Sequence, residues 1–248
     1  MTHQTDSSPS PVSLVVGGTS GIGAETARLL AGRGHQLVIS GSRSPQDAAA
    51  LVKELDAAYL RADMRDPAGP ARLIGQVRES FGRLDNVVYS AGATARIPHP
   101  DIDAVTDEVW DLILGMNVVT PWRLIQAAAP LLKASGRGTV TAVGALAGVD
   151  VGGSSIPYAV SKAALHHMCK LLGAVLGPET RINAVAPGLI TTPWTAGFDT
   201  LRAYVADKAP LHRSGTPQDV ADVIVGLIDY QYVTGQTVVI DGGLSLIV

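Results

Sequence analysis

The sequence is poor in cysteine and in charge. Cys169 is the only cysteine among 248 residues, which excludes an intramolecular disulfide and any zinc site built from several cysteines. Charged residues make up 17% of the chain, and 19 basic against 22 acidic side chains give a net charge of −3. This balance predicts no binding of nucleic acid and favours a small-molecule partner. A lone cysteine is also typical of the reducing cytoplasm, where we expect the protein.

Long apolar runs are missing too, although 46% of the residues are hydrophobic. No run approaches the roughly 20 residues that a membrane-spanning helix needs, so we expect no membrane contact. Residues 1–11 are polar and lack the apolar core of a secretory signal, and we interpret them as a disordered lead-in. His166 and His167 are neighbours on a predicted helix and point about 100° apart, which makes them poor ligands for one metal. We expect no metal site.

Short β-branched runs alternate with longer helical patterns from Val12 to Val239, and no Gly/Ser linker separates them. We therefore expect residues 12–248 to form one domain. The predicted strands are Ser13–Gly17, Gln36–Ser40, Ala58–Arg61, Asn86–Tyr89, Gly138–Val143, Arg181–Val185 and Thr237–Ile240. The predicted helices cover 22–33, 46–56, 67–81, 105–135, 157–177 and 217–229, with Pro130 ending or bending the fourth. This order predicts an α/β fold: a doubly wound parallel sheet (Rossmann fold) of seven strands flanked by helices.

A glycine-rich turn follows the first predicted strand. It reads Gly17-Gly18-Thr19-Ser20-Gly21-Ile22-Gly23 and leads into a helix-forming segment. Glycines at 17, 21 and 23 let the backbone turn sharply and approach a pyrophosphate, whose charge the helix N-terminus attracts. A turn without a ligand is the alternative, but the position between strand and helix favours dinucleotide binding.

The end of the second predicted strand bears on the choice of nucleotide. An NAD site would place Asp or Glu near position 41 to accept from the ribose 2′-hydroxyl, and this chain has Gly41 there. Ser42 and Arg43 could instead donate to a 2′-phosphate, although most arginines are simply solvated. We predict NADP(H) rather than NAD(H).

Tyr158 and Lys162 are four residues apart and so share one face of a predicted helix. A phenol can give a proton to a developing alkoxide, or take one in the reverse reaction. A neighbouring ammonium is expected to lower the pKa of the phenol from about 10 toward the working pH. An exposed helical pair is the alternative interpretation, but the dinucleotide turn favours catalysis.

The chain resembles the short-chain dehydrogenase/reductase family from about Val12 to Gly243. The resemblance rests on the Gly-x-x-x-Gly-x-Gly turn, on Tyr-x-x-x-Lys, and on the segments 182–193 and 234–243. It implies an oxidoreductase that interconverts a carbonyl and an alcohol by hydride transfer, with Asn117 supporting a proton relay to Lys162. An Asn bonded to its own backbone is the alternative there. The resemblance also implies cofactor contacts at Gly17, Thr19, Ser20, Gly21, Ile22, Gly23, Ser42, Arg43, Asp63, Met64, Ala91, Gly92, Tyr158, Lys162, Pro187, Gly188, Ile190 and Thr192.

One family residue is missing. The family carries a serine 13 residues before the tyrosine, where its hydroxyl polarises the substrate oxygen, and this chain has Ala145. Ser154 or Ser155 could replace that hydroxyl, or the substrate could bring its own polar group. Alternatively, the protein binds NADP(H) with little turnover and acts as a sensor or scaffold.

The resemblance also bears on substrate and assembly. Family members cover the site with the segment after Trp194, here carrying Phe198, Leu201 and Tyr204. Together with Leu146, Val149 and Val151, these residues predict a mainly apolar pocket, although they could be ordinary core residues. Relatives pair the long helices across two-fold axes, which predicts a homodimer or homotetramer through 105–135 and 157–177.

Overall fold

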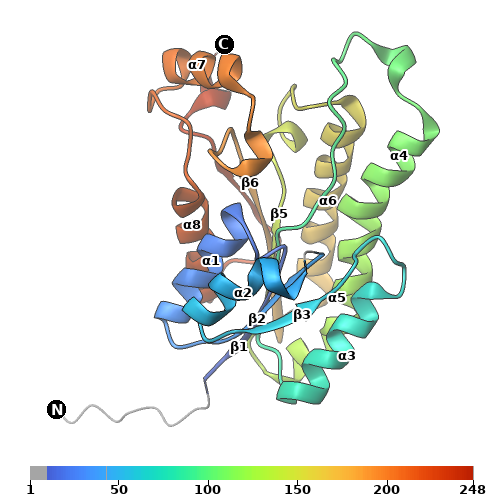
Figure 1. Ribbon diagram of the computed structural model, residues 1–248, viewed down its shortest axis with the longest axis vertical. Coiled ribbons are helices and arrows are strands. Elements are labelled where there is room, and N and C mark those ends of the chain that lie inside the picture. Colours follow the sequence, from blue (N-terminus) through green and yellow to red (C-terminus); the bar gives the residue numbers. More distant parts are fainter. Residues whose placement is uncertain (1–9, 43, 248) are drawn as a thin grey trace, which may run out of the picture.

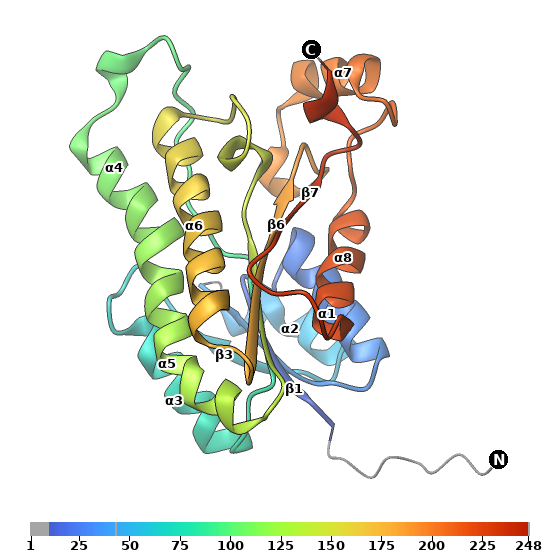
Figure 2. The ribbon, with the colours of Figure 1, turned by 180° about the vertical axis from the view of Figure 1, so that it is seen from behind.

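The computed structural model describes residues 10–42 and 44–247, and these build one seven-stranded parallel sheet covered by helices on both faces (Figures 1 and 2). The strand order is β3-β2-β1-β4-β5-β6-β7. After β3 the chain crosses back to the other side of β1 and adds β4 to β7 there, so the crevice of a doubly wound sheet lies between β1 and β4. Most of the predicted lead-in, residues 1–9, and Arg43 lie outside the described residues. The predicted fold class is confirmed.

The strands match the prediction within two residues at each end. Their bounds are β1 Val12–Val16, β2 Gln36–Gly41, β3 Ala58–Arg61, β4 Asn86–Tyr89, β5 Gly138–Val143, β6 Thr180–Pro187 and β7 Thr237–Ile240. The five residues of β1 are all buried, and so are the four of β4 and the six of β5. Near-continuous apolar runs are required because helices cover both faces of a parallel sheet.

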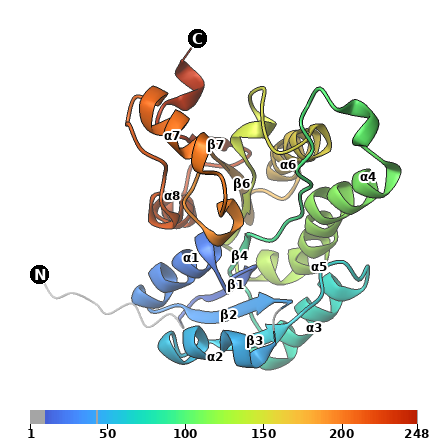
Figure 3. The same ribbon diagram turned by 45° about the horizontal axis from the view of Figure 1, so that its top comes forward.

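The helices form two layers. Their bounds are α1 Gly21–Gly32, α2 Pro45–Glu54, α3 Gly69–Phe81, α4 Asp107–Leu114, α5 Thr120–Ala134, α6 Ile156–Val175, α7 Asp199–Lys208 and α8 Pro217–Asp229, with short helical turns at Ile102–Ala104, Gly115–Val119, Leu146–Gly148, Pro193–Thr195 and Leu244–Leu246. Helices α1, α2 and α8 pack on one face, and α3, α5 and α6 on the other (Figure 3). None of the helices described is long and apolar enough to cross a membrane.

The predicted helix 105–135 is wrong in one respect. A π-helical turn, Gly115–Val119, joins α4 to α5, and it contains Asn117. Pro121 stands at the start of α5 and has no N–H, so the Asn117 carbonyl cannot accept the usual hydrogen bond from four residues on. Pro130, expected to end or bend the helix, lies inside α5, which continues to Ala134.

A buried polar network crosses the sheet below the site. Asn86 donates to Ser13 Oγ at 2.9 Å and accepts from Thr139 Oγ1 at 2.8 Å, which links β4 to both neighbouring strands. Ser13 Oγ also lies 2.7 Å from His35 Nδ1. These bonds satisfy the buried polar atoms of the network. They also define the register of the three strands more sharply than apolar contacts alone would.

Candidate active site

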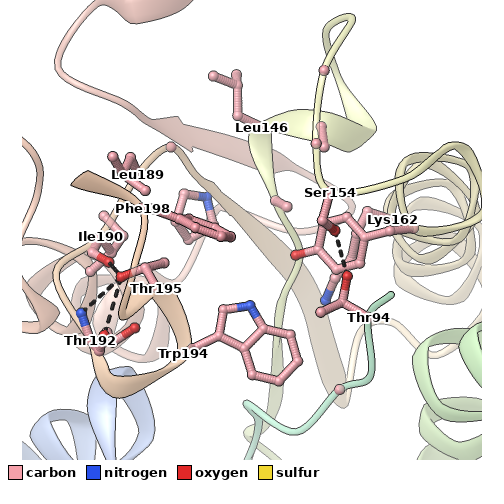
Figure 4. Close-up of a pocket in the computed structure, with 18 of the residues that line it drawn as sticks. Thr94, Leu146, Ser154, Lys162, Leu189, Ile190, Thr192, Trp194, Thr195 and Phe198 are labelled. Atoms are coloured by element: carbon pink, nitrogen blue, oxygen red, sulfur yellow. Dashed lines mark hydrogen bonds between the residues drawn. The ribbon is translucent and has the colours of Figure 1, made fainter. Parts of the chain in front are cut away.

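A cavity of about 890 Å³ opens at the carboxyl edge of the sheet (Figure 4). Its walls come from the ends of β1, β4, β5 and β6, from the start of α6, and from the segment that carries α7. The predicted site residues that line it are Gly17, Ser20, Gly21, Ile22, Ala91, Gly92, Ser154, Tyr158, Lys162, Pro187, Gly188, Ile190 and Thr192. Thr19, Gly23, Ser42, Asp63, Met64, Asn117 and Ser155 are not part of that lining. The cavity thus unites the predicted cofactor turn with the predicted catalytic pair.

The glycines of the turn lie so close to neighbouring backbone that a side chain at position 17 or 23 would not fit. Gly17 has φ +78°, and a Cβ there would lie 2.8 Å from the backbone of Ser90 and Ala91. A Cβ on Gly23 would lie 2.3 Å from the Gly17 carbonyl oxygen. Ser20 caps α1 without a side-chain hydrogen bond to any residue of the described chain. The turn, the free hydroxyl and the helix N-terminus together fit a phosphate.

The ribose end of the predicted cofactor site has mixed character. Ser42 is exposed after β2, whereas a Cβ on Gly41 would lie 3.2 Å from Thr19 Cγ2. The Asp63 carboxylate accepts hydrogen bonds from the guanidinium and then the backbone N–H of Arg65, which hold its pKa below the usual range. Met64 is buried, and its carbonyl accepts from Thr120. Neither Gly41 nor Ser42 offers a negative charge to a nucleotide.

Tyr158 and Lys162 belong to the first turns of α6, and both side chains line the cavity. Ser155 caps this helix by accepting a hydrogen bond from the Tyr158 backbone N–H at 3.3 Å. Lys162 is only 5% exposed, and its Nζ donates to the Val143 carbonyl at 2.9 Å. The ammonium also lies 5.6 Å from the centre of the Tyr158 ring. The spacing of four residues therefore places both groups in one site, as predicted.

The expected effect of Lys162 on the phenol is wrong for this structure. Burial raises the pKa of Tyr158 to about 12, because a phenolate would lose its hydration. Burial also lowers the pKa of Lys162 to about 8. The ammonium bonds to a carbonyl and not to the phenol, so desolvation outweighs attraction between the two groups. The phenol is protonated at neutral pH.

Asn117 ties α6, which carries Tyr158 and Lys162, to the segment that follows β4. Its side chain accepts from the Ala93 N–H at 2.9 Å and donates to the Ala93 carbonyl at 3.0 Å. It also donates to Ser161 Oγ at 2.9 Å, and Ser161 donates to the Tyr158 carbonyl at 2.7 Å. The side chain, fully buried, is thus occupied by protein groups. The predicted relay would have to use its backbone carbonyl, which Pro121 leaves without the ordinary helical donor.

No side-chain hydroxyl stands at position 145, where the family carries its serine. Ala145 lines the cavity with an extended backbone and no donor on its side chain. Of the two suggested substitutes, Ser155 is fully buried in its helix cap and is not in the cavity wall. Ser154 does line the cavity, and its hydroxyl is hydrogen-bonded to that of Thr94 (Figure 4). Of the two, Ser154 is the one that faces the cavity, and Thr94 lines the cavity although no motif in the sequence indicated it.

The outer wall of the cavity is apolar, as predicted. Its large side chains are Trp194, Phe198, Leu201, Tyr204, Leu146 and Val151, whereas Val149 lies outside the lining. The segment after Trp194 contains a helix, α7, which the sequence patterns did not indicate. Arg96 fastens this wall by donating to the Ala196 carbonyl at 3.2 Å and stacking 4.3 Å from the centre of the Phe198 ring.

His166 is a buried titratable group beside the site. Sequence patterns placed it on a helix face, but it is only 8% exposed, and neither ring nitrogen has a hydrogen bond of ordinary geometry to a described residue. A Cβ on Gly144 would lie 1.9 Å from its Nε2, so the ring fills the space beside that glycine. Burial and then the charge of Lys162 lower the pKa of His166 to about 4, and the Gly148 backbone opposes them.

Comparison with known proteins identifies the family. A family model described as enoyl-(acyl carrier protein) reductase matches residues 16–245. The chain is 44% identical, over 98% of its length, to a Streptomyces violaceoruber protein named "Granaticin polyketide synthase putative ketoacyl reductase 2", of which it covers 99%. It is 33% identical, over 95% of its length, to the 3-oxoacyl-(acyl-carrier-protein) reductase FabG of Thermotoga maritima, of which it covers 98%.

Solved structures agree. A short-chain type dehydrogenase/reductase from Mycobacterium ulcerans matches with a TM-score of 0.88 at 31% identity, over 95% of this chain and 90% of that one. The RhlG/NADP active-site complex of Pseudomonas aeruginosa matches with a TM-score of 0.86 at 28% identity, over 94% and 96%. The chain belongs to the short-chain dehydrogenase/reductase family and is an oxidoreductase.

His166 predicts loss of stability in mild acid. Its folded pKa of about 4 lies below the unfolded value of about 6.5, so the unfolded chain binds the proton more readily, and stability falls as pH drops from about 6.5 toward 4. We expect a loss of up to about 3 kcal/mol from this group. Denaturant unfolding of His166→Leu between pH 7 and pH 5 should show a smaller loss than wild type. His167 is exposed, and His167→Leu is the control. If the free energy of unfolding of His166→Leu falls with pH as steeply as that of wild type, His166 is not the group responsible.

Proposed function

We propose that the protein is an NADP(H)-dependent oxidoreductase that interconverts a carbonyl and an alcohol, with Tyr158 as the general acid and base. The observation that carries the proposal is a protonated, partly buried phenol beside a buried ammonium, in the same cavity as a phosphate-binding turn. This arrangement serves reduction directly, because a carbonyl oxygen that gains negative charge needs a proton donor.

The chain's own groups divide the work. The nicotinamide would supply or accept the hydride at the carbonyl carbon. The Tyr158 hydroxyl would give its proton to the carbonyl oxygen, and in the reverse direction a phenolate would take the alcohol proton. The Lys162 ammonium, held by Val143, would favour the phenolate that reduction leaves behind. Asn117 would hold the helix in register and offer its backbone carbonyl to a relay water.

The phosphate-binding turn would hold the pyrophosphate, and Ser42 with Arg43 would meet a ribose 2′-phosphate. Two observations support NADP(H): Gly41 replaces the acid that an NAD site needs, and Asp63, the nearby acid, is already paired with Arg65. The resemblance to an NADP complex of Pseudomonas aeruginosa is consistent with this choice.

Ser154 would supply the hydrogen bond that Ala145 cannot. It is the hydroxyl among the two sequence candidates that faces the cavity, and it comes from the loop that packs against Tyr158. A donor aimed at the substrate oxygen acts most strongly as that oxygen becomes negative. Because the wall around it is apolar, we propose a largely apolar carbonyl substrate, and a 3-ketoacyl thioester belongs in the assay panel given the names of the relatives.

The helical layer of α4, α5 and α6 is proposed as a contact between copies of the chain. Its large apolar side chains remain open to solvent, among them Trp122 at 45%, Leu171 at 56% and Val175 at 71% exposed. Trp122, Leu171 and Val175 share one shallow apolar hollow between α5 and α6. A two-fold axis through this face would cover both copies at once and give a homodimer or, with a second axis, a homotetramer.

The proton donor and the replacement hydroxyl are tested by substitution. Tyr158→Phe should abolish measurable carbonyl reduction, because it removes the proton donor. Ser154→Ala should lower kcat by about 10²–10³-fold with cofactor affinity nearly unchanged, and Ala145→Ser should restore activity to that variant. The measurement is steady-state NADPH oxidation over a ketone and ketoacyl panel. No turnover by wild type together with turnover by Ala145→Ser would sink the enzyme assignment and favour the cofactor-binding sensor.

Cofactor choice is tested by binding. Wild type should bind NADPH more tightly than NADH, because a charge-assisted contact reaches the 2′-phosphate. Arg43→Ala should weaken NADPH binding by about tenfold or more and leave NADH binding within about twofold. Fluorescence titration measures both constants without any substrate. Equal weakening of the two cofactors, or a wild type that prefers NADH, would show that the nucleotide is chosen otherwise.

Assembly is tested by mass. Light scattering of wild type at micromolar concentration should give a multiple of the 25.6 kDa chain mass. Leu171→Glu should shift the distribution toward the monomer, since a carboxylate would be buried in the apolar contact. Tyr232→Glu, at another exposed position, should keep the helical contact. A monomeric wild type, or equal behaviour of the two variants, argues against this interface.

A further inference from the structure

The segment 93–97, between β4 and the turn Ile102–Ala104, lies between the catalytic helix and the outer wall. The backbone of Ala93 is held on both sides by the Asn117 side chain. The Ile97 N–H donates to the Ser154 carbonyl at 2.8 Å. Thr94 stands between these two anchors, so its side chain is presented from a fixed backbone toward the cavity that it lines.

The Thr94 hydroxyl is hydrogen-bonded to Ser154 Oγ, and the two side chains point toward one another across the cavity wall (Figure 4). The direction of this bond decides what Ser154 can do. If Thr94 donates, the Ser154 hydrogen remains available to the cavity. If Ser154 donates, Thr94 must place its hydrogen elsewhere, and its other acceptor, the Ala95 carbonyl, lies at a long 3.4 Å. Because a bond of 3.4 Å is weak, Thr94 is free to donate to Ser154 instead, and only that direction leaves the Ser154 hydrogen available to a ligand.

Ser154 follows a residue, Gly153, that packs against the Tyr158 ring. Gly153, at φ +103°, brings the loop against the catalytic ring: a Cβ there would lie 3.4 Å from Tyr158 Cδ1 and 2.7 Å from Ala147 Cβ. The Ser154 backbone is fixed by Ile97 and its side chain by Thr94. A hydroxyl that accepts one hydrogen bond also becomes a stronger donor through the next.

We propose that Thr94 is a positioning residue for the reaction: its hydroxyl donates to Ser154 and so orients and polarises the Ser154 hydroxyl toward the substrate oxygen. The inference rests on the proposed function, in which Ser154 replaces the serine missing at Ala145. No proton is transferred between the two hydroxyls, and Thr94 does not touch the substrate. The pair achieves with two residues from different loops what one serine on the strand end does elsewhere.

The decisive variants are Thr94→Val and Thr94→Ser. Valine has nearly the shape of threonine without the hydroxyl, whereas serine keeps the hydroxyl. Thr94→Val should lower kcat by about five- to tenfold with KM and NADPH affinity within about twofold, and Thr94→Ser should stay within about twofold of wild type. If Thr94 only tied two loops together, the two variants would instead differ in Tm and in cofactor affinity, with kcat following them.

Double variants separate action through Ser154 from independent action. In a Ser154→Ala background, Thr94→Val should cause no further loss of kcat, because the group it orients is gone. In an Ala145→Ser background, Thr94→Val should also be nearly silent, because a serine on the strand end takes over. The inference is overturned if Thr94→Val lowers kcat by about the same five- to tenfold in either background, or if Thr94→Ser loses as much kcat as Thr94→Val.

Crystal structures of the NADPH complexes keep the inference testable if wild type reduces no panel member, which would defeat the proposed function alone. Ser154 Oγ should occupy the same position in wild type and Thr94→Ser and should rotate away in Thr94→Val. An unchanged Ser154 rotamer in Thr94→Val means that Thr94 does not position it.

Discussion

The hydrogen bonds of the Asn117 side chain are the constraint on which the site depends. One buried amide joins the segment after β4, through Ala93, to α6, through Ser161. The π-helical turn makes this possible, because the extra residue in the turn directs Asn117 inward at the point where α4 becomes α5. The segment 93–97 inherits its position from this joint, and it then contacts the loop before α6 and the outer wall.

Electrostatics in the site are governed by burial. Lys162 keeps a buried ammonium by bonding to the carbonyl at the end of β5, and Tyr158 keeps its proton because burial disfavours the phenolate more than the ammonium, 5.6 Å from the ring centre, favours it. Both shifts favour neutral groups, as low dielectric surroundings require. A bound dinucleotide, with its ribose hydroxyls and its charge, would change these surroundings, so the cofactor would be part of the acid–base apparatus as well as the hydride carrier.

Much of the fold could be predicted from the sequence, because apolar runs of strand length and a glycine-rich turn at the first strand end leave few arrangements. The spacing of Tyr158 and Lys162 likewise fixed their common face. Other features depend on contacts between distant segments. Nothing local distinguishes Ser154 from Ser155: one faces the cavity and the other caps α6, and the choice follows from the helix start. Thr94 belongs to no motif, and the direction of the Tyr158 shift depends on burial that residue spacing does not contain.

The contact between Gly144 and His166 has a consequence for how this sequence can change. The imidazole occupies the space that any side chain at position 144 would need, since a Cβ there would nearly coincide with Nε2. Position 166 can therefore become smaller by itself, but position 144 can become larger only if the ring has shrunk and the Val185 carbonyl, 2.9 Å from that Cβ, has also moved. Ala145, the next residue, already carries a Cβ and lines the cavity. A change in the shape of the cavity at this end of β5 is thus blocked at Gly144, whereas position 145 already accommodates a side chain that faces the cavity.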